Sequence, residues 1–181
     1  MKYKIVTPAT ELAVSVLEMK NHLRETSSSL DNLIEGYIKA ATQLFEQRTN
    51  QAVMTQTWRL TLAYDEVVER VEIYKYPILG FSSITYYDAD NVSQSLTNSQ
   101  GDYISYVDGR PGTLIFDDPP TTYERDDAMT VTFLAGYSTV PEDIKLAIKM
   151  LVWRMYVHPD DPVSERLSYV DRIVMDHRGW R

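Results

Sequence analysis

The side chains that could do chemistry near neutral pH are few. Only His22, His158 and His177 could act as bases, and none has a candidate nucleophile beside it in a strand-to-helix turn. The sequence contains no P-loop, G-x-S-x-G, G-x-G-x-x-G or H-E-x-x-H motif, and it has no cysteine. We therefore expect a protein that is not an enzyme, with no catalytic residue, no metal and no cofactor.

Three acidic motifs resemble known sites but have simpler explanations. The run 158–161 (HPDD) looks like a metal-ligand cluster, yet a proline and acidic turn residues also stop a helix. Asp88 and Asp90 have the spacing that opens a calcium loop, but the glycine and glutamate that complete such a loop are missing, so we expect a turn. The pairs 117–118 and 126–127 could supply glycosidase carboxylates, but both fall in predicted loops.

The negative charge is confined to the middle of the chain. Residues 57–137 carry five basic and thirteen acidic side chains, which accounts for the whole formal net charge of −8. Such a segment gains nothing from counterion release on a phosphate backbone, so we expect no direct DNA binding by it. The acidity either keeps the protein soluble or faces a DNA channel. The candidates for a channel-facing role are Asp65, Glu66, Glu69, Asp88, Asp90, Asp117, Asp118, Asp126 and Asp127.

Length and composition favour one ordered domain made in a reducing cytoplasm. The chain has 181 residues, of which 44% are hydrophobic, and this is enough to bury a core. The absence of cysteine excludes a disulfide framework. No run approaches the roughly eighteen apolar residues of a membrane span, so no membrane partner is expected.

Three helices are predicted by capping residues and by apolar spacing. Ser15 and Glu18 form a capping box for a helix over about 15–24. Apolar residues at helical spacing predict a second helix over about 30–48, and a third over 142–157 that ends at Pro159. The three helices should share one core that buries Leu33, Ile34, Ile38, Ala41, Leu44, Ile148 and Leu151 together.

Between the helices the apolar period changes from 3.6 to 2. Trp58, Leu60 and Leu62 alternate with polar residues. Similar alternation returns at 71–73, 84–86, 103–107, 113–116 and 129–135. Turn clusters separate these segments, which predicts a mostly antiparallel β-module of five or six strands over about 57–137. The expected fold is α+β: a three-helix core (about 15–50 and 141–157) with the β-module inserted before its last helix, within a domain at 1–159.

Several ordered segments resemble the phage head-tail connector (adaptor) proteins. They are EMKNHLR at 18–24, DNLI at 31–34, KAAT at 39–42 and FE at 45–46, followed by TQTW at 55–58, YPI at 76–78 and SITYYD at 83–88. VTFLAGY at 131–137 and VPEDIK at 140–145 look like the family's entry into its last core helix, before Ala147, Ile148 and Tyr156. The family often has a glycine-rich hairpin after the SITYYD strand, where this chain has Asp90-Asn91-Val92.

The resemblance implies a structural subunit of a virion. A homo-oligomeric ring, commonly twelvefold, would dock beneath the portal protein and would meet a stopper or tail-completion protein on its other side. DNA would pass through the ring without specific binding, and assembly would take place in the cytoplasm of a host bacterium.

The tail at 160–181 resembles no family segment and is too apolar for a purely solvated end. We expect a tail helix here and a portal-docking element that does not pack on the core; the alternative is a short helix folded back on its own subunit. The first interpretation gives these portal-binding candidates: Arg166, Leu167, Val170, Arg172, Ile173, Arg178, Trp180 and Arg181.

Two other functions are compatible with the residues. A tail-completion or stopper protein would share these sequence features but would form the next ring toward the tail. A small acidic hydrolase or carbohydrate-binding module could use the thirteen tyrosines and three tryptophans, although aromatic residues in such numbers are more often core or interface material.

Overall fold

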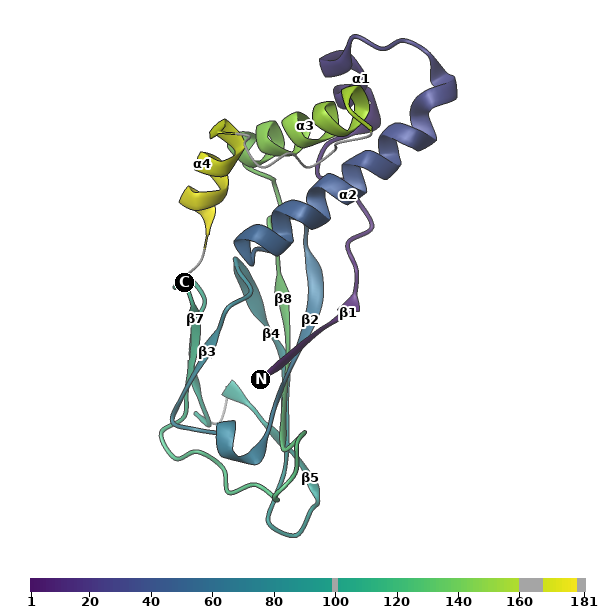
Figure 1. Ribbon diagram of the computed structural model, residues 1–181. Helices are drawn as coiled ribbons and strands as arrows, with labels where there is room; N and C mark the ends of the chain where they lie inside the picture. The colour runs from purple at the N-terminus through teal and green to yellow at the C-terminus, as the bar shows by residue number, and fades with distance from the viewer. Residues whose placement is uncertain (99–100, 160–167, 179–181) are drawn as a thin grey trace. The chain divides into compact units, whose positions relative to one another are not determined.

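The computed structural model describes residues 1–98, 101–159 and 168–178, which form two compact units (Figure 1). The β-unit contains residues 1–8 and 55–136. The helical unit contains residues 9–54 together with the described residues from 137 to 178. The predicted α+β class is confirmed. Seven of the eight described strands lie between the second and third helices, and one strand, at residues 2–7, precedes the first helix.

The helical unit contains four α-helices. Their bounds are α1 Val16–Leu23, α2 Asp31–Thr49, α3 Glu142–Val157 and α4 Ser168–His177, with a 3-10 turn, η1 Ser28–Leu30, before α2. The predicted cap of the first helix is present, because Ser15 Oγ accepts a hydrogen bond from Glu18 N at 3.1 Å. The Glu18 carboxylate forms an ion pair with Lys149 of α3 at 2.5 Å and so links α1 to α3.

The core of the helical unit follows the predicted stripe with one error. Ile34, Ile38 and Ala41 of α2 are buried with Ile148 and Leu151 of α3, and Leu44 is partly buried against the same cluster. Leu33 was also predicted to be buried. This prediction is wrong, because 45% of the surface of Leu33 is exposed. The buried stripe continues from Ile34 through Phe45, and Leu33 lies about 100° around the helix from it.

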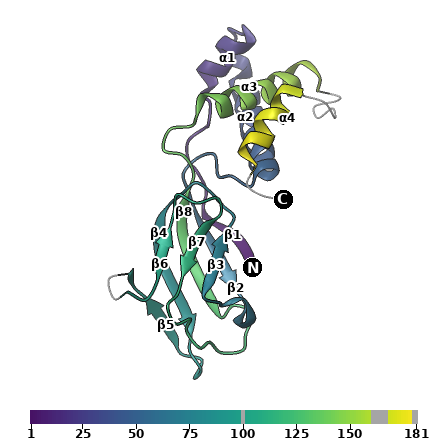
Figure 2. The ribbon, with the colours of Figure 1, turned by 90° about the vertical axis from the view of Figure 1, so that its left-hand side faces the viewer.

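The β-unit consists of two antiparallel sheets. The larger has the strand order β1-β2-β8-β4-β5 and the smaller β3-β7-β6. Figure 2 shows the smaller sheet in front of the larger one, and a Cβ on Gly112 of β7 would collide with Ile78 of β4. The strands are β1 Lys2–Thr7, β2 Gln56–Leu62, β3 Arg70–Ile73, β4 Ile78–Tyr87, β5 Ser93–Leu96, β6 Ile104–Tyr106, β7 Gly112–Ile115 and β8 Met129–Ala135.

The alternation in the sequence identifies the inner faces of the sheets. Trp58, Leu60 and Leu62 of β2 are buried, as are Val131 and Phe133 of β8. The six strands β2, β3, β4, β6, β7 and β8 match the predicted segments. Strands β1 and β5 were not predicted: β1 is an edge strand with five of its six residues exposed, and β5 begins with the polar run Ser-Gln-Ser.

Replacing Leu151 with alanine tests the helical core. Leu151 is 1% exposed, so Leu151→Ala should lower the free energy of unfolding by about 2–5 kcal/mol. Leu33→Ala is the matched control, and its effect should stay within about 0.5 kcal/mol. Urea unfolding followed by far-UV circular dichroism measures both values, and equal effects for the two variants would contradict this description of the core.

Candidate interaction surfaces

All nine acidic candidates lie at one end of the β-unit, which we call the acidic end. In antiparallel sheets the end of each strand lies beside the start of its neighbour, as Leu62 lies opposite Met129 and Tyr87 opposite Ser93. The candidates follow β2, β4 and β7 or precede β3, β5 and β8. They are Asp65, Glu66, Glu69, Asp88, Asp90, Asp117, Asp118, Asp126 and Asp127.

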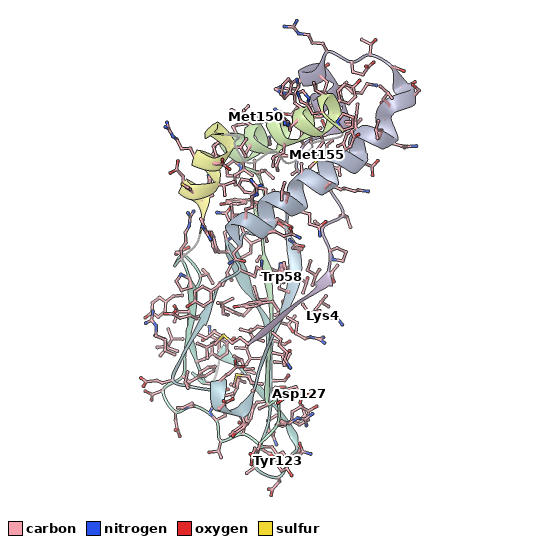
Figure 3. The ribbon with its side chains drawn as sticks, in the orientation of Figure 1. Lys4, Trp58, Tyr123, Asp127, Met150 and Met155 are labelled. Carbon is pink, nitrogen blue, oxygen red and sulfur yellow. The ribbon has the colours of Figure 1, made fainter. Side chains whose placement is uncertain are left out.

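Most of these carboxylates are open to solvent, and few cations accompany them. Seven of the nine residues are exposed, while Glu66 and Asp88 are partly buried. The N-terminal ammonium pairs with Glu66, Lys2 with Asp126 at 3.8 Å, and Arg125 with Asp127 at 2.6 Å. Figure 3 shows Asp127 and Tyr123 at this end of the unit. The acidic end therefore presents a negative potential that repels phosphate.

Asp88 builds the turn between β4 and β5. Its carboxylate accepts hydrogen bonds from Gln94 Nε2 at 2.8 Å and from the backbone N–H groups of Val92 and Asp90 at 2.9 and 3.1 Å. These bonds lower the pKa of Asp88, the one from Gln94 most of all. Asp88 therefore organises a turn, as the sequence predicted, and no calcium loop is needed to explain it.

Arg125 holds the last loop before β8 against that turn. It donates to both carboxylate oxygens of Asp127 at 2.6 and 2.9 Å and to Asn91 Oδ1 at 2.9 Å, and it stacks on the Tyr87 ring at 3.7 Å. The hydrogen bond from Arg125 lowers the pKa of Asp127. The acidic end is thus an ordered surface at this loop.

The candidates of the C-terminal tail are only partly described. Arg166, Leu167, Trp180 and Arg181 lie outside the described residues. Val170 and Ile173 are buried in the helical core together with Val174, whereas Arg172 and Arg178 are exposed. The expectation that the tail leaves the core is wrong for α4, because its apolar stripe is long enough to fill the groove beside α2 and α3. The structure has the folded-back helix that the sequence left as the other possibility.

A polar clasp, formed by Gln51, Asp143 and His177, fastens the end of α4. Gln51 is fully buried, and its Nε2 donates to the His177 carbonyl at 2.9 Å and lies 3.3 Å from His177 Nδ1. His177 Nε2 lies 2.6 Å from Asp143 Oδ2. These distances fit the tautomer in which Nε2 carries the hydrogen and donates to Asp143. Sequence reasoning missed the clasp, because Gln51 and His177 are 126 positions apart in the sequence.

The clasp also affects the carboxyl group of Asp143. Burial opposes its ionisation, but hydrogen bonds from His177 and from the Ile144 N–H outweigh burial and lower the pKa of Asp143. An ion pair between Arg48 and Asp171 at 3.5 Å links α2 directly to α4. The Asp–His contact therefore serves to dock a helix.

Within the described residues, nothing gathers into a site for metal or membrane chemistry. No group of three or more histidine and acidic side chains in 1–98, 101–159 and 168–178 could hold a metal ion. None of the described helices combines the length and apolar character needed to cross a bilayer.

The sequence profile of one family, described as "Head completion protein", matches residues 13–161. This match covers most of the chain and includes the segments that resemble connector proteins. No curated protein sequence matches the chain significantly.

Solved structures of gene transfer agent (GTA) particles contain chains with the same fold. One, titled "Neck of empty GTA particle computed with C6 symmetry", has a TM-score of 0.85 at 20% identity, with 100% of this chain and 97% of that chain covered. Chains from "Virion of native gene transfer agent (GTA) particle" and "Neck of native GTA particle computed with C12 symmetry" have TM-scores of 0.80 and 0.79 at the same identity and coverage. At this identity the likeness establishes the fold.

Acid titration tests the pairing of Arg125 with Asp127. Because the folded-state pKa of Asp127 is lowered, its ion pair stabilises the protein above the ordinary aspartate pKa of about 4, and this contribution is lost as the pH falls through the folded value. Wild type should therefore unfold at higher urea than Asp127→Asn at neutral pH, and the difference should disappear in acid. Asp117→Asn is the exposed control, and a difference that does not depend on pH would contradict the pairing.

Removing the buried amide tests the polar clasp. Gln51→Ala should loosen α4 by about 1–3 kcal/mol, because it takes away hydrogen bonds to a buried carbonyl. Amide hydrogen exchange in α4 should then be roughly 5- to 100-fold faster, with little change in α2. Gln47→Ala, on the exposed face of α2, is the control. Unchanged exchange in α4 would show that the clasp does not hold the helix.

Proposed function

The chain belongs to the head completion protein family, and on this premise we propose that it forms a ring that joins the head of a tailed phage or phage-like particle to the tail. The family is structural, so the protein has a structural role at the head-tail junction and is not an enzyme. This membership confirms the predicted resemblance and removes the hydrolase alternative.

The proposed ring is supported by the particles in which the same fold occurs. Chains with this fold come from necks solved with C6 and C12 symmetry. A ring of identical subunits closes when one face of each subunit binds a different face of the next, with a rotation that returns to the start. We assign the protein to such a ring, twelvefold in the virion, between the portal protein and a stopper or tail-completion protein.

The acidic end is the part of the subunit proposed to face the DNA channel. Its exposed carboxylates repel the phosphate backbone, and they outnumber the cations that pair with them. A channel wall of this sign lets DNA pass without being held. If the acidic end lay on the outer wall of the ring, solubility would be its whole role.

The exposed side of α4 is the part proposed to meet the portal. Arg172 and Arg178 are on the surface, and arginine forms planar, two-point hydrogen bonds with carboxylates. Val170 and Ile173 support this surface from beneath and are not offered to the partner.

Electron microscopy of the purified protein, alone and mixed with its portal, tests the role. Rings seated on the portal are expected. A protein that binds tail proteins but not the portal would instead be a tail-completion or stopper protein.

Arg172→Ala with Arg178→Ala should weaken portal binding by about tenfold or more and leave the fold intact, since both residues are exposed.

Neutralising the acidic end tests the channel. Asp117→Asn, Asp118→Asn and Asp126→Asn together should increase retention of double-stranded DNA by assembled rings, most strongly at low salt. The matched control removes three exposed carboxylates elsewhere, with Glu11→Gln, Asp108→Asn and Asp176→Asn. Equal DNA retention by the two triple variants would mean that only net charge matters and that the acidic end does not line the channel.

A further inference from the structure

The face of α3 directed away from the helical core carries a second apolar strip. Leu146, Trp153 and Val157 recur at helical spacing on the side opposite Ile148 and Leu151, and Met150 at the edge of this side is partly buried against the helical core. Trp153 is 44% exposed and Val157 45%, while Leu146 and Met150 are partly buried. Figure 3 shows Met155 on the side of α3 that faces α2 and Met150 on the other side. We call Leu146, Trp153 and Val157 the α3 strip.

The residues that flank the α3 strip are already paired within the subunit. Lys145 binds Glu142 at 2.8 Å, and Lys149 binds Glu18 at 2.5 Å. Both lysine side chains are largely covered, with 22% and 16% of their surface exposed. The neighbourhood of Trp153 is therefore close to neutral, which suits burial against another apolar surface better than contact with DNA or with a strongly charged partner.

The outer face of α2 carries a flat apolar strip. Leu33 is 45% exposed, and Gly36 and Ala40 follow it on the same side of the helix, all exposed. We call these three residues the α2 strip. Glycine is unfavourable within a helix, and a Cβ on Gly36 would meet no atom within 4 Å. No packing requirement inside the subunit explains this glycine.

The two strips lie on opposite sides of the helical unit. Helices α2 and α3 pack through their buried stripes, so residues on the far side of each helix point in opposite directions. One strip projects a large aromatic side chain, and the other offers small residues that allow close approach. A subunit with two different, complementary faces on opposite sides has what a head-to-tail ring interface requires.

We infer that neighbouring copies of this chain associate by packing the α3 strip of one subunit on the α2 strip of the next, with Trp153 seated over Gly36 and Ala40. This interface rests on the ring proposed above and identifies the residues that close it. The other occupant to consider, a helix of a different protein, would use one strip and leave the second without a role.

The lack of cysteine allows a direct crosslinking test in the full-length protein. A chain carrying both Ala40→Cys and Val157→Cys should form a ladder of disulfide-linked oligomers on mild oxidation. The control pair is Lys39→Cys with Val157→Cys, because Lys39 lies about 100° around α2 from Ala40 and should give few crosslinks. No ladder from the first pair, or equal ladders from both pairs, would overturn the interface.

Substitutions separate effects on association from effects on folding. Trp153→Ala should weaken subunit association by about 30-fold or more, as expected for a central aromatic anchor. The control is Leu17→Ala, which alters an exposed leucine of α1 and should change the association constant by no more than about twofold. Gly36→Ala should raise the melting temperature of the free subunit, and Gly36→Trp should block association without unfolding the helix.

Mixing two blocked variants tests that the two faces differ. Trp153→Glu retains only the α2 strip and Gly36→Trp retains only the α3 strip, so each alone should be monomeric and their mixture should stop at a heterodimer by sedimentation. Rings formed by wild type and by both variants would overturn this interface and leave the proposed ring intact. A wild-type protein that forms no ring, with or without portal, would overturn both.

Discussion

The fold depends on the pairing of the two strands that begin and end the inserted β-segment. Strands β2 and β8 pair without a break from Gln56 opposite Ala135 to Leu62 opposite Met129. The ends of an insertion of about eighty residues are thus brought together, and in the helical unit Tyr137 N donates to Val53 O at 3.3 Å. Since α2 ends just before this segment and α3 begins just after it, the pairing makes possible the helix packing that buries Phe45 and Ile148.

The same antiparallel order also sorts the charges. In such sheets every second connection lies at the same end. Carboxylates that are as far apart in the sequence as Asp65 and Asp127 are therefore placed at one end of the β-unit. Local contacts then fix their loops: Asp88 folds its turn, and Arg125 ties two loops together. The acidic composition of the middle of the chain becomes a property of one surface through topology.

The sequence predicted the elements with strong patterns and missed those whose stability depends on distant partners. Capping at Ser15 and the stripes of α2 and α3 gave the helices nearly to their ends, and alternation gave six strands. Strand β1 has little pattern, because an edge strand is held by its neighbour's backbone. Leu33 was misassigned because its apolar side chain fits the spacing but lies beside the buried stripe. The clasp of Gln51 and His177 has no local signal at all.

The close approach of Val53 and Tyr137 makes the inserted part of the β-unit, residues 55–136, a module. A short turn could join the two residues and leave the sequence of the helical unit otherwise unchanged, because the chain leaves and re-enters that unit at neighbouring positions. Mutations in the inserted strands and loops can then accumulate, or whole strands can be gained or lost, without altering the packing of α2 on α3. Evolution can therefore change what the inserted segment presents to its surroundings while the packing of the helices is preserved.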